Sequence, residues 1–164
     1  MQKLVCWLAL ALLAANAVAS DRPAIEGTWI RATPPNASTA AVYLTIRGTD
    51  EADRLTGAHT SIADTVEIHT TLERDGVLHM QRVPELPIAP HETVEFAPGA
   101  EHLMLIGLKS PLTPGDTVVI TLQFERVGAV DVTFAVLDAR AEKAGAMHQH
   151  GASSKAPSSH AARH

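Results

Sequence analysis

Cysteine is nearly absent from this sequence, and its scarcity limits the chemistry that the chain can perform. The only cysteine among the 164 residues is Cys6, which lies in an N-terminal segment, residues 1–19, that we expect to be removed. The mature chain, beginning at Ser20, would then contain no thiol. Such a chain can form no disulfide framework, use no cysteine nucleophile and bind no metal through a thiolate.

Residues 1–19 have the three parts of a secretory signal peptide. Lys3 supplies the positive start, Leu4 to Ala15 form the apolar run, and Ala17-Val18-Ala19 is a small-residue cleavage site. The apolar run is too short for a comfortable membrane span, which disfavours the alternative of an uncleaved anchor. The single cysteine is not near the cleavage site, so we expect export, cleavage near Ala19/Ser20 and no lipid anchor.

Basic residues and further apolar runs are also few. Removing Lys3 with the signal changes the formal net charge from −5 to −6, with histidine taken as neutral. An acidic balance argues against nucleic acid or an anionic membrane surface as the main partner. No second hydrophobic span follows, so we expect no stable membrane insertion after cleavage. The 145 residues that remain are enough for one domain with a hydrophobic core, which we place at residues 20–139.

This domain has no convincing long amphipathic helix, but it has many short runs in which apolar and polar residues alternate. Val42, Leu44 and Ile46 alternate with polar or aromatic neighbours, and residues 118–124 and 130–136 form two longer alternating runs. Alternation of this kind predicts half-buried strands. We therefore expect an all-β sandwich of two packed antiparallel sheets, with the two longer runs forming a hairpin at one side of a sheet.

The middle of the chain is predicted to hold further strands. Residues 65–71 and 77–82 flank Arg74-Asp75-Gly76, which is a hairpin turn signal. Three prolines between residues 83 and 91 predict an irregular or edge segment, whereas residues 55–62 are ambiguous. These strands matter because they carry the side chains with the most distinctive chemistry.

Four side chains in this region can bind a soft metal: His69, Met80, His102 and Met104. Ten residues separate the first from the second, twenty-one the second from the third, and one the third from the fourth. Thioether sulfur is soft and neutral and selects Cu(I), while imidazole suits copper in general. Two histidines and two methionines could therefore hold Cu(I) without a thiol, which suits an oxidising compartment. The alternative is that the methionines fill the core and the histidines are solvated.

Strand alternation assigns faces to these residues and their neighbours. If residues 102–108 form a strand, His102 and Met104 face the same way. His69 shares a face with Glu67, which is either a plain exposed glutamate or an acceptor that orients the imidazole. His79 is adjacent to Met80 and should point to the opposite face. Two further histidines are expected on the surface, in loops: His59 and His91.

The last segment, residues 140–164, differs in composition from the rest. Alanine, serine, glycine, lysine and histidine dominate it without apolar periodicity, so we expect a disordered tail. It contains Met147, His148 and His150 close together, and histidine-rich tracts bind metals. Two interpretations stay open: a solvated tail, or a second, weaker copper site that captures Cu(II) or passes metal to the main site.

With these residues in view, the sequence resembles the periplasmic copper chaperones of the PCu(A)C type. The signature of that family is His, ten residues, Met, twenty-one residues and His-x-Met, and His69, Met80, His102 and Met104 match it at every position. Flanking stretches also resemble the family, from residue 28 to residue 137: WIRATPP, AAVYLTI, TVEIH, APGAEHLMLIGLK and GDTVVITLQFE. Some members have a methionine directly after the first histidine, where this chain has Thr70.

The resemblance implies a cupredoxin-like (Ig-like Greek-key) β-sandwich that binds Cu(I) through these four side chains at an exposed site in the periplasm. It also implies delivery of the metal, usually to the binuclear copper site of cytochrome c oxidase and often alongside Sco-type thiol proteins. A carrier must release its metal by ligand exchange, so an exposed site makes physical sense.

Other functions remain to be weighed beside a chaperone. An electron-transfer cupredoxin needs a thiolate ligand, which the mature chain lacks. No serine nucleophile motif, zincin helix or phosphate loop indicates an enzyme. A protein that buffers copper for tolerance, without a dedicated recipient, is the nearest alternative. A structural Ig-like domain without a metal is the more distant one.

Overall fold

The computed structural model of the chain describes residues 22–138, which form ten β-strands with no helix among them. The prediction of an all-β domain is therefore confirmed for this part of the chain. The predicted signal peptide (1–19) and tail (140–164) lie outside the described residues, as do the outermost residues of the predicted domain. The strands are β1 (Ala24–Arg31), β2 (Thr39–Arg47), β3 (Asp53–His59), β4 (Thr65–Arg74), β5 (Val77–Val83), β6 (Leu86–Ile88), β7 (Thr93–Phe96), β8 (His102–Ile106), β9 (Thr117–Phe124) and β10 (Gly128–Leu137).

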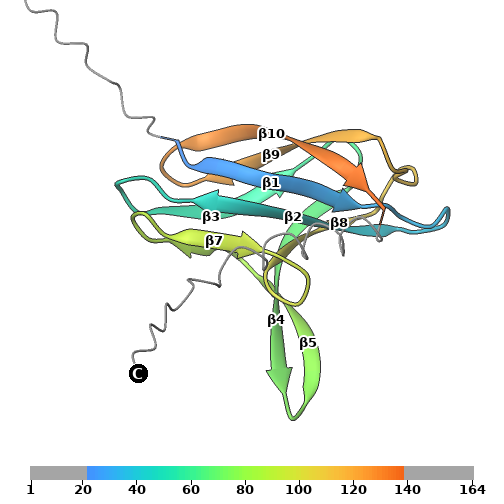
Figure 1. Ribbon diagram of the computed structural model, residues 1–164, viewed down its shortest axis with the longest axis horizontal. Coiled ribbons are helices and arrows are strands. Elements are labelled where there is room, and N and C mark those ends of the chain that lie inside the picture. The colour runs from blue at the N-terminus through green and yellow to red at the C-terminus, as the bar shows by residue number, and fades with distance from the viewer. Residues whose placement is uncertain (1–21, 139–164) are drawn as a thin grey trace, which may run out of the picture.

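The strands pair in the order β5-β4-β8-β2-β1-β10-β9-β3-β6. β3 also pairs with β4, through Ala58 and Val66, so the ladder folds round and closes on itself. β1 and β10 are parallel, and the other named strand pairs are antiparallel. Figure 1 shows β1, β9 and β10 along one side of the body, while the β4–β5 hairpin projects out of the opposite side.

The interior of the sandwich is filled by the apolar faces of the strands other than β5, whose residues are exposed apart from the partly buried Val83. One row of directly paired residues crosses β10, β1, β2, β8 and β4, and every member is at most 3% exposed: Val136, Ile30, Val42, Leu103 and Ile68. The alternation predicted for residues 118–124 is seen in the burial pattern of β9. In β2 it is only partial, because Tyr43, predicted on the other face, is also buried, with its ring centroid 4.3 Å from that of Trp29. The same alternation sends the residues on either side of Leu103 and Ile68 to the other face of the sheet.

Three details of the strand predictions are settled by the structure. The β9–β10 hairpin does not lie at one side of a sheet, because β10 pairs with β1 and β9 pairs with β3. Alternation identifies the buried face of a strand but not its neighbour across a long connection, so this prediction was wrong. The ambiguous residues 55–62 mostly belong to β3, and the proline-rich residues 83–91 contain the last residue of β5 and the short edge strand β6, as predicted. No helix among residues 22–138 is long and apolar enough to cross a membrane.

Candidate metal site

The β4–β5 hairpin is closed by the predicted turn at Asp75 and Gly76. Both residues have positive φ, 54° and 76°, as a two-residue type I′ turn requires. β4 pairs with β8 only as far as His69, and beyond that residue its partner is β5. The outer part of the hairpin is therefore a two-stranded arm extending from the body (Figure 1).

The strand registers bring the four donor side chains to one face of β5, β4 and β8. His69 is directly opposite His102, and Met104 is opposite Glu67, two residues before His69. Met80 is opposite Thr71, two residues after His69. Directly opposed residues of antiparallel strands, and every second residue along a strand, point to the same face. The four side chains thus surround one patch of the outer surface, centred on the two histidines.

The two imidazoles are close enough to share one metal ion. Their ring centroids are 5.8 Å apart and their planes meet at 62°. Metal–nitrogen bonds are about 2 Å long, so two imidazoles on one metal have ring centres roughly 5–6 Å apart. The separation of His69 and His102 is of that size.

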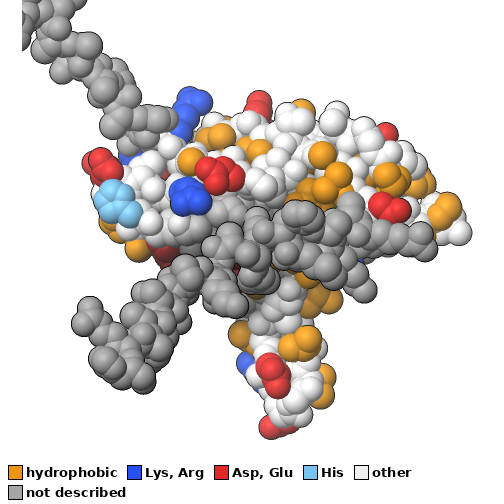
Figure 2. All heavy atoms as spheres, viewed as in Figure 1, with side chains coloured by type: hydrophobic (Ala, Val, Ile, Leu, Met, Phe, Trp, Pro, Cys, Tyr) orange, Lys and Arg blue, Asp and Glu red, His pale blue; other side chains and the backbone are white. Residues whose placement is uncertain are grey.

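The four side chains differ strongly in exposure. His102 is only 5% exposed and is the one buried polar residue among residues 22–138. His69 and Met104 are partly buried, whereas Met80 on the projecting arm is 64% exposed. Apolar side chains gather on this arm, as Figure 2 shows, and the exposed ones are Leu72, Val77, Leu78 and Met80. The site therefore has a sheltered pair of nitrogens and one thioether that is open to solvent.

Hydrogen bonds decide which ring nitrogens can bind a metal. His69 Nε2 lies 2.9 Å from Glu67 Oε2, and His102 Nδ1 lies 3.2 Å from the carbonyl oxygen of Ala100. Both partners are acceptors, so each of these nitrogens carries the proton of the neutral ring. His69 Nδ1 and His102 Nε2 then keep their lone pairs. His69 Nδ1 is buried and has no hydrogen-bond partner within residues 22–138, as expected of a nitrogen reserved for a metal.

Neighbouring residues fall where alternation predicts, with one exception. Thr70 points to the other face and donates from Oγ1 to Glu101 Oε1 at 3.3 Å, so it does not replace the missing methionine. His79 pairs across the hairpin with Leu72, on the face opposite Met80. His91 is exposed in a loop. His59 is exposed as predicted, but it ends strand β3 and does not lie in a loop.

Sequence reasoning missed Arg82. This residue lies directly opposite His69 in the hairpin, and its Nε is 3.5 Å from Glu67 Oε1. Its position two residues after Met80, on the same strand, was the available signal.

The three tail residues proposed as a second site, Met147, His148 and His150, lie outside the described residues. Within residues 22–138 no group of three or more His, Cys, Asp or Glu side chains could hold a metal ion.

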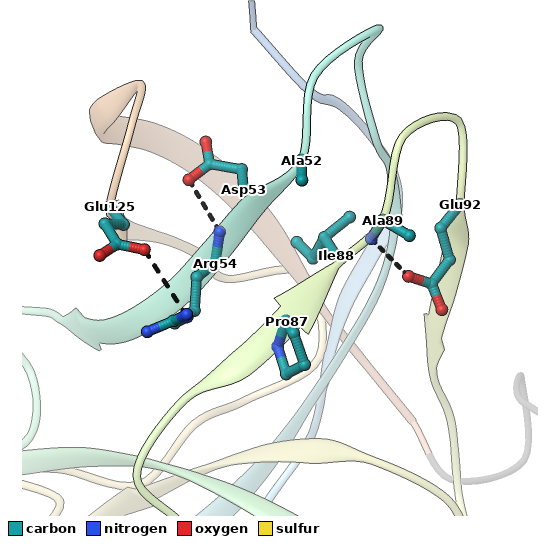
Figure 3. A pocket seen from close by; sticks show the side chains of 8 residues that line it. All are labelled: Ala52, Asp53, Arg54, Pro87, Ile88, Ala89, Glu92 and Glu125. Carbon is teal, nitrogen blue, oxygen red and sulfur yellow. Dashed lines mark hydrogen bonds and ion pairs between the residues drawn. The ribbon is translucent and has the colours of Figure 1, made fainter.

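A separate shallow pocket of about 410 Å³ lies away from the donor face, between the start of β3 and the segment around β6. Figure 3 shows Arg54 between Asp53 and Glu125, and Glu92 accepting from the backbone N–H of Ala89. Arg54 forms an ion pair with Glu125, while Asp53 and Glu92 accept hydrogen bonds from backbone N–H groups. None of the four donor residues lines this pocket. We therefore regard the face of β4, β5 and β8 as the candidate site.

Comparisons with known proteins agree with this fold. Among solved structures, the copper-bound PCuAC domain from PmoF2 is 27% identical and has a TM-score of 0.60, covering 70% of this chain and 91% of that domain. The solution structure of CuI-DR1885 from Deinococcus radiodurans is 32% identical with a TM-score of 0.61, covering 75% of this chain and 83% of that one. The predicted fold class, a cupredoxin-like β-sandwich, is therefore confirmed.

Sequence comparison gives the family. The putative lipoprotein Lxx21020 of Leifsonia xyli subsp. xyli is 28% identical over 121 residues, which are 73% of this chain and 72% of that protein. A family model described as "Putative lipoprotein LpqE-like" matches residues 24–136, from β1 to the end of the β9–β10 hairpin. The match contains all four donor residues and the whole closed ladder. The chain belongs to the LpqE-like family.

Proposed function

We propose that this protein is a copper chaperone that binds Cu(I) through His69, Met80, His102 and Met104 and passes it to a recipient protein. The observation that carries the proposal is the strand register, which gathers two imidazoles and two thioethers on one face of β5, β4 and β8. Thioethers favour Cu(I) over hard or borderline cations. Two similar structures were solved with copper, one of them as the CuI form, which supports copper as the cargo.

The unequal exposure of the ligands suits a carrier better than a permanent metal site. The sheltered histidines His69 and His102 would keep hold of the ion, while Met80 is open to solvent. A donor from a recipient protein can reach the metal from the Met80 side and replace that thioether first. The ion then moves by stepwise ligand exchange, with no chemical turnover, so the protein acts as a carrier and not as an enzyme.

We place this activity in the periplasm, after export by the signal peptide at residues 1–19. Relatives described as putative lipoproteins are consistent with export. The single cysteine of this chain, Cys6, precedes the proposed cleavage site, so we propose a mature protein without a lipid anchor. The proposed recipient is the copper site of cytochrome c oxidase, with a Sco-type thiol protein as a second partner, since thiolates can take Cu(I) from thioethers.

The first test is a titration of the mature protein, residues 20–164, with Cu(I) in the presence of a competing chelator. We expect one tightly bound Cu(I), and we expect the Met80→Ala/Met104→Ala double variant to lose it. His79→Ala is the matched control, because it removes a donor adjacent to Met80 but on the opposite face of the hairpin. Equal affinity of the wild type and the double variant would show that the four-ligand site does not exist.

Copper buffering is the second candidate, favoured by the extra donors Met147, His148 and His150 in the tail. A buffer needs capacity, whereas a chaperone needs a recipient. Deleting the gene separates them: loss of oxidase activity at low copper supports delivery, and copper sensitivity with normal oxidase activity supports buffering.

A further inference from the structure

Glu67 occupies a central place behind the candidate metal site. It lies two residues before His69 on β4, on the same face, and its side chain is 20% exposed. One carboxylate oxygen, Oε2, is 2.9 Å from His69 Nε2, and the other, Oε1, is 3.5 Å from Arg82 Nε. Glu67 is also directly opposite Met104 in the ladder. A single carboxylate is therefore next to three residues around the site.

This contact selects one form of the His69 ring. An ionised carboxylate can only accept hydrogen bonds, so His69 Nε2 must carry a proton to make a 2.9 Å contact with it. In a neutral imidazole the other nitrogen, Nδ1, is then the one with a lone pair. Nδ1 is buried and makes no hydrogen bond with any residue of the described part. Rotation of the ring would break the bond to Glu67, so the carboxylate fixes the orientation of the ring as well as its tautomer.

His102 has the reverse arrangement. Its Nδ1 donates to the carbonyl of Ala100 at 3.2 Å, which leaves Nε2 as the nitrogen with a lone pair. Histidines that bind metals generally donate their other N–H to a carboxylate or a backbone carbonyl, and these partners hold the ring in place. The site uses one partner of each kind. The backbone carbonyl cannot be removed by substitution, but Glu67 can.

We infer that Glu67 is a positioning residue. Its carboxylate accepts a hydrogen bond from His69 Nε2–H, which favours that tautomer and leaves the lone pair of His69 Nδ1, together with that of His102 Nε2, for Cu(I). Arg82 supports this role by binding the second carboxylate oxygen, which limits rotation of the Glu67 side chain. Its side chain is 67% exposed, so its contribution is smaller than that of Glu67. The inference rests on the proposed Cu(I) function, because it names the nitrogen through which one ligand would bind.

The test uses ¹⁵N-labelled full-length mature protein at a pH where histidine is neutral. In the copper-free protein we expect a protected Nε2–H proton resonance for His69, assigned by its loss in His69→Gln. Glu67→Ala should abolish this resonance, and Glu67→Gln, which keeps an acceptor oxygen, should retain it. The Nδ1–H resonance of His102 should persist in both variants. On loading with Cu(I), which is diamagnetic, the ¹⁵N shift of His69 should change at Nδ1.

Cu(I) affinity is measured for the same variants against a competing chelator. We expect a 10- to 100-fold loss for Glu67→Ala, the usual range for a partner that orients a metal ligand, and a smaller loss for Glu67→Gln and Arg82→Gln. Glu73→Gln is the matched control, since it removes the same charge from an exposed position on the same strand. It should bind like the wild type.

The outcomes separate this inference from the proposed function. Unchanged affinity in Glu67→Ala, or a Cu(I)-induced shift at His69 Nε2, overturns the role of Glu67 and leaves the chaperone proposal intact. Wild-type affinity in His69→Gln overturns the proposed site itself, and with it the inference.

Discussion

At the level of single residues, the site and the core occupy opposite faces of the same strands. Leu103, which lies between the proposed ligands His102 and Met104, is completely buried and belongs to the row of paired core residues. Met80 is 64% exposed and contacts the core little. A side chain placed for metal binding and a side chain that stabilises the core can thus be adjacent in sequence. Substitutions can therefore change metal binding and stability separately.

We predict that Met80→Ala affects mainly Cu(I) affinity, whereas Leu103→Ala affects mainly stability. Met80→Ala should weaken Cu(I) binding but change the free energy of unfolding by less than about 0.5 kcal/mol, as is usual for an exposed substitution. Leu103→Ala should lower the free energy of unfolding by about 2–5 kcal/mol through the cavity that it leaves. Urea unfolding of the copper-free proteins measures both values. A destabilisation of several kcal/mol by Met80→Ala would show that the hairpin arm packs more tightly than its exposure indicates.

At the level of elements, Asp53 ties the start of β3 to the turn between β9 and β10. Its carboxylate accepts backbone N–H groups from Arg54 at 2.7 Å, Arg126 at 2.9 Å and Val127 at 3.3 Å. Burial by itself would raise the pKa of this carboxyl. The three hydrogen bonds, with the nearby charge of Arg126, outweigh burial and hold the pKa of Asp53 below the ordinary value of an aspartate.

Because the pKa of Asp53 is lower in the folded state than in the unfolded state, its contribution to stability is present above about pH 4 and disappears as the pH falls through the folded value. Asp53→Asn should lower the free energy of unfolding by roughly 1–3 kcal/mol at pH 7. The difference between wild type and variant should shrink as the pH falls from 4 to 2. Urea unfolding across this range tests it, with Asp75→Asn in the exposed turn as the control. A difference that does not depend on pH would contradict the assignment.

Elements also show how far the sequence could be interpreted alone. The core-facing sides of β2, β4, β8 and β9 follow from alternation, because every second residue of each strand is apolar and faces the core. The β4–β5 hairpin follows from Asp75-Gly76, whose turn conformation few other residue pairs adopt. The parallel pairing of β1 with β10 and the closure of β3 onto β4 could not be predicted, since they join residues far apart in the chain. The His69–Glu67 contact could be anticipated, because alternation places both residues on one face of β4. The Arg82–Glu67 contact was missed, although the hairpin turn already sets Arg82 opposite His69.

At the level of the whole molecule, the fold alone does not decide the function. Sandwiches of the cupredoxin type can carry copper for electron transfer or for delivery, and the choice depends on the ligands that the fold presents. Here the projecting arm places an exposed thioether above two sheltered imidazoles, and the proposed mature chain has no cysteine. The ligand set suits a carrier of Cu(I), because a blue-copper centre needs a thiolate with two histidines.

We therefore predict that the mature protein, with copper bound, shows no intense visible absorption band of the kind that a copper–thiolate bond produces. Addition of Cu(II) should give only weak absorption, and reduction to Cu(I) should leave the protein colourless with its metal retained. The copper should also stay bound after treatment with a thiol-alkylating reagent, because no thiol takes part in binding. The measurement is a visible spectrum and a copper analysis after gel filtration, before and after reduction. A strong blue band, or loss of copper on alkylation, would mean that Cys6 remains in the mature chain and takes part in binding, which would overturn both the cleavage site and the thiol-free ligand set.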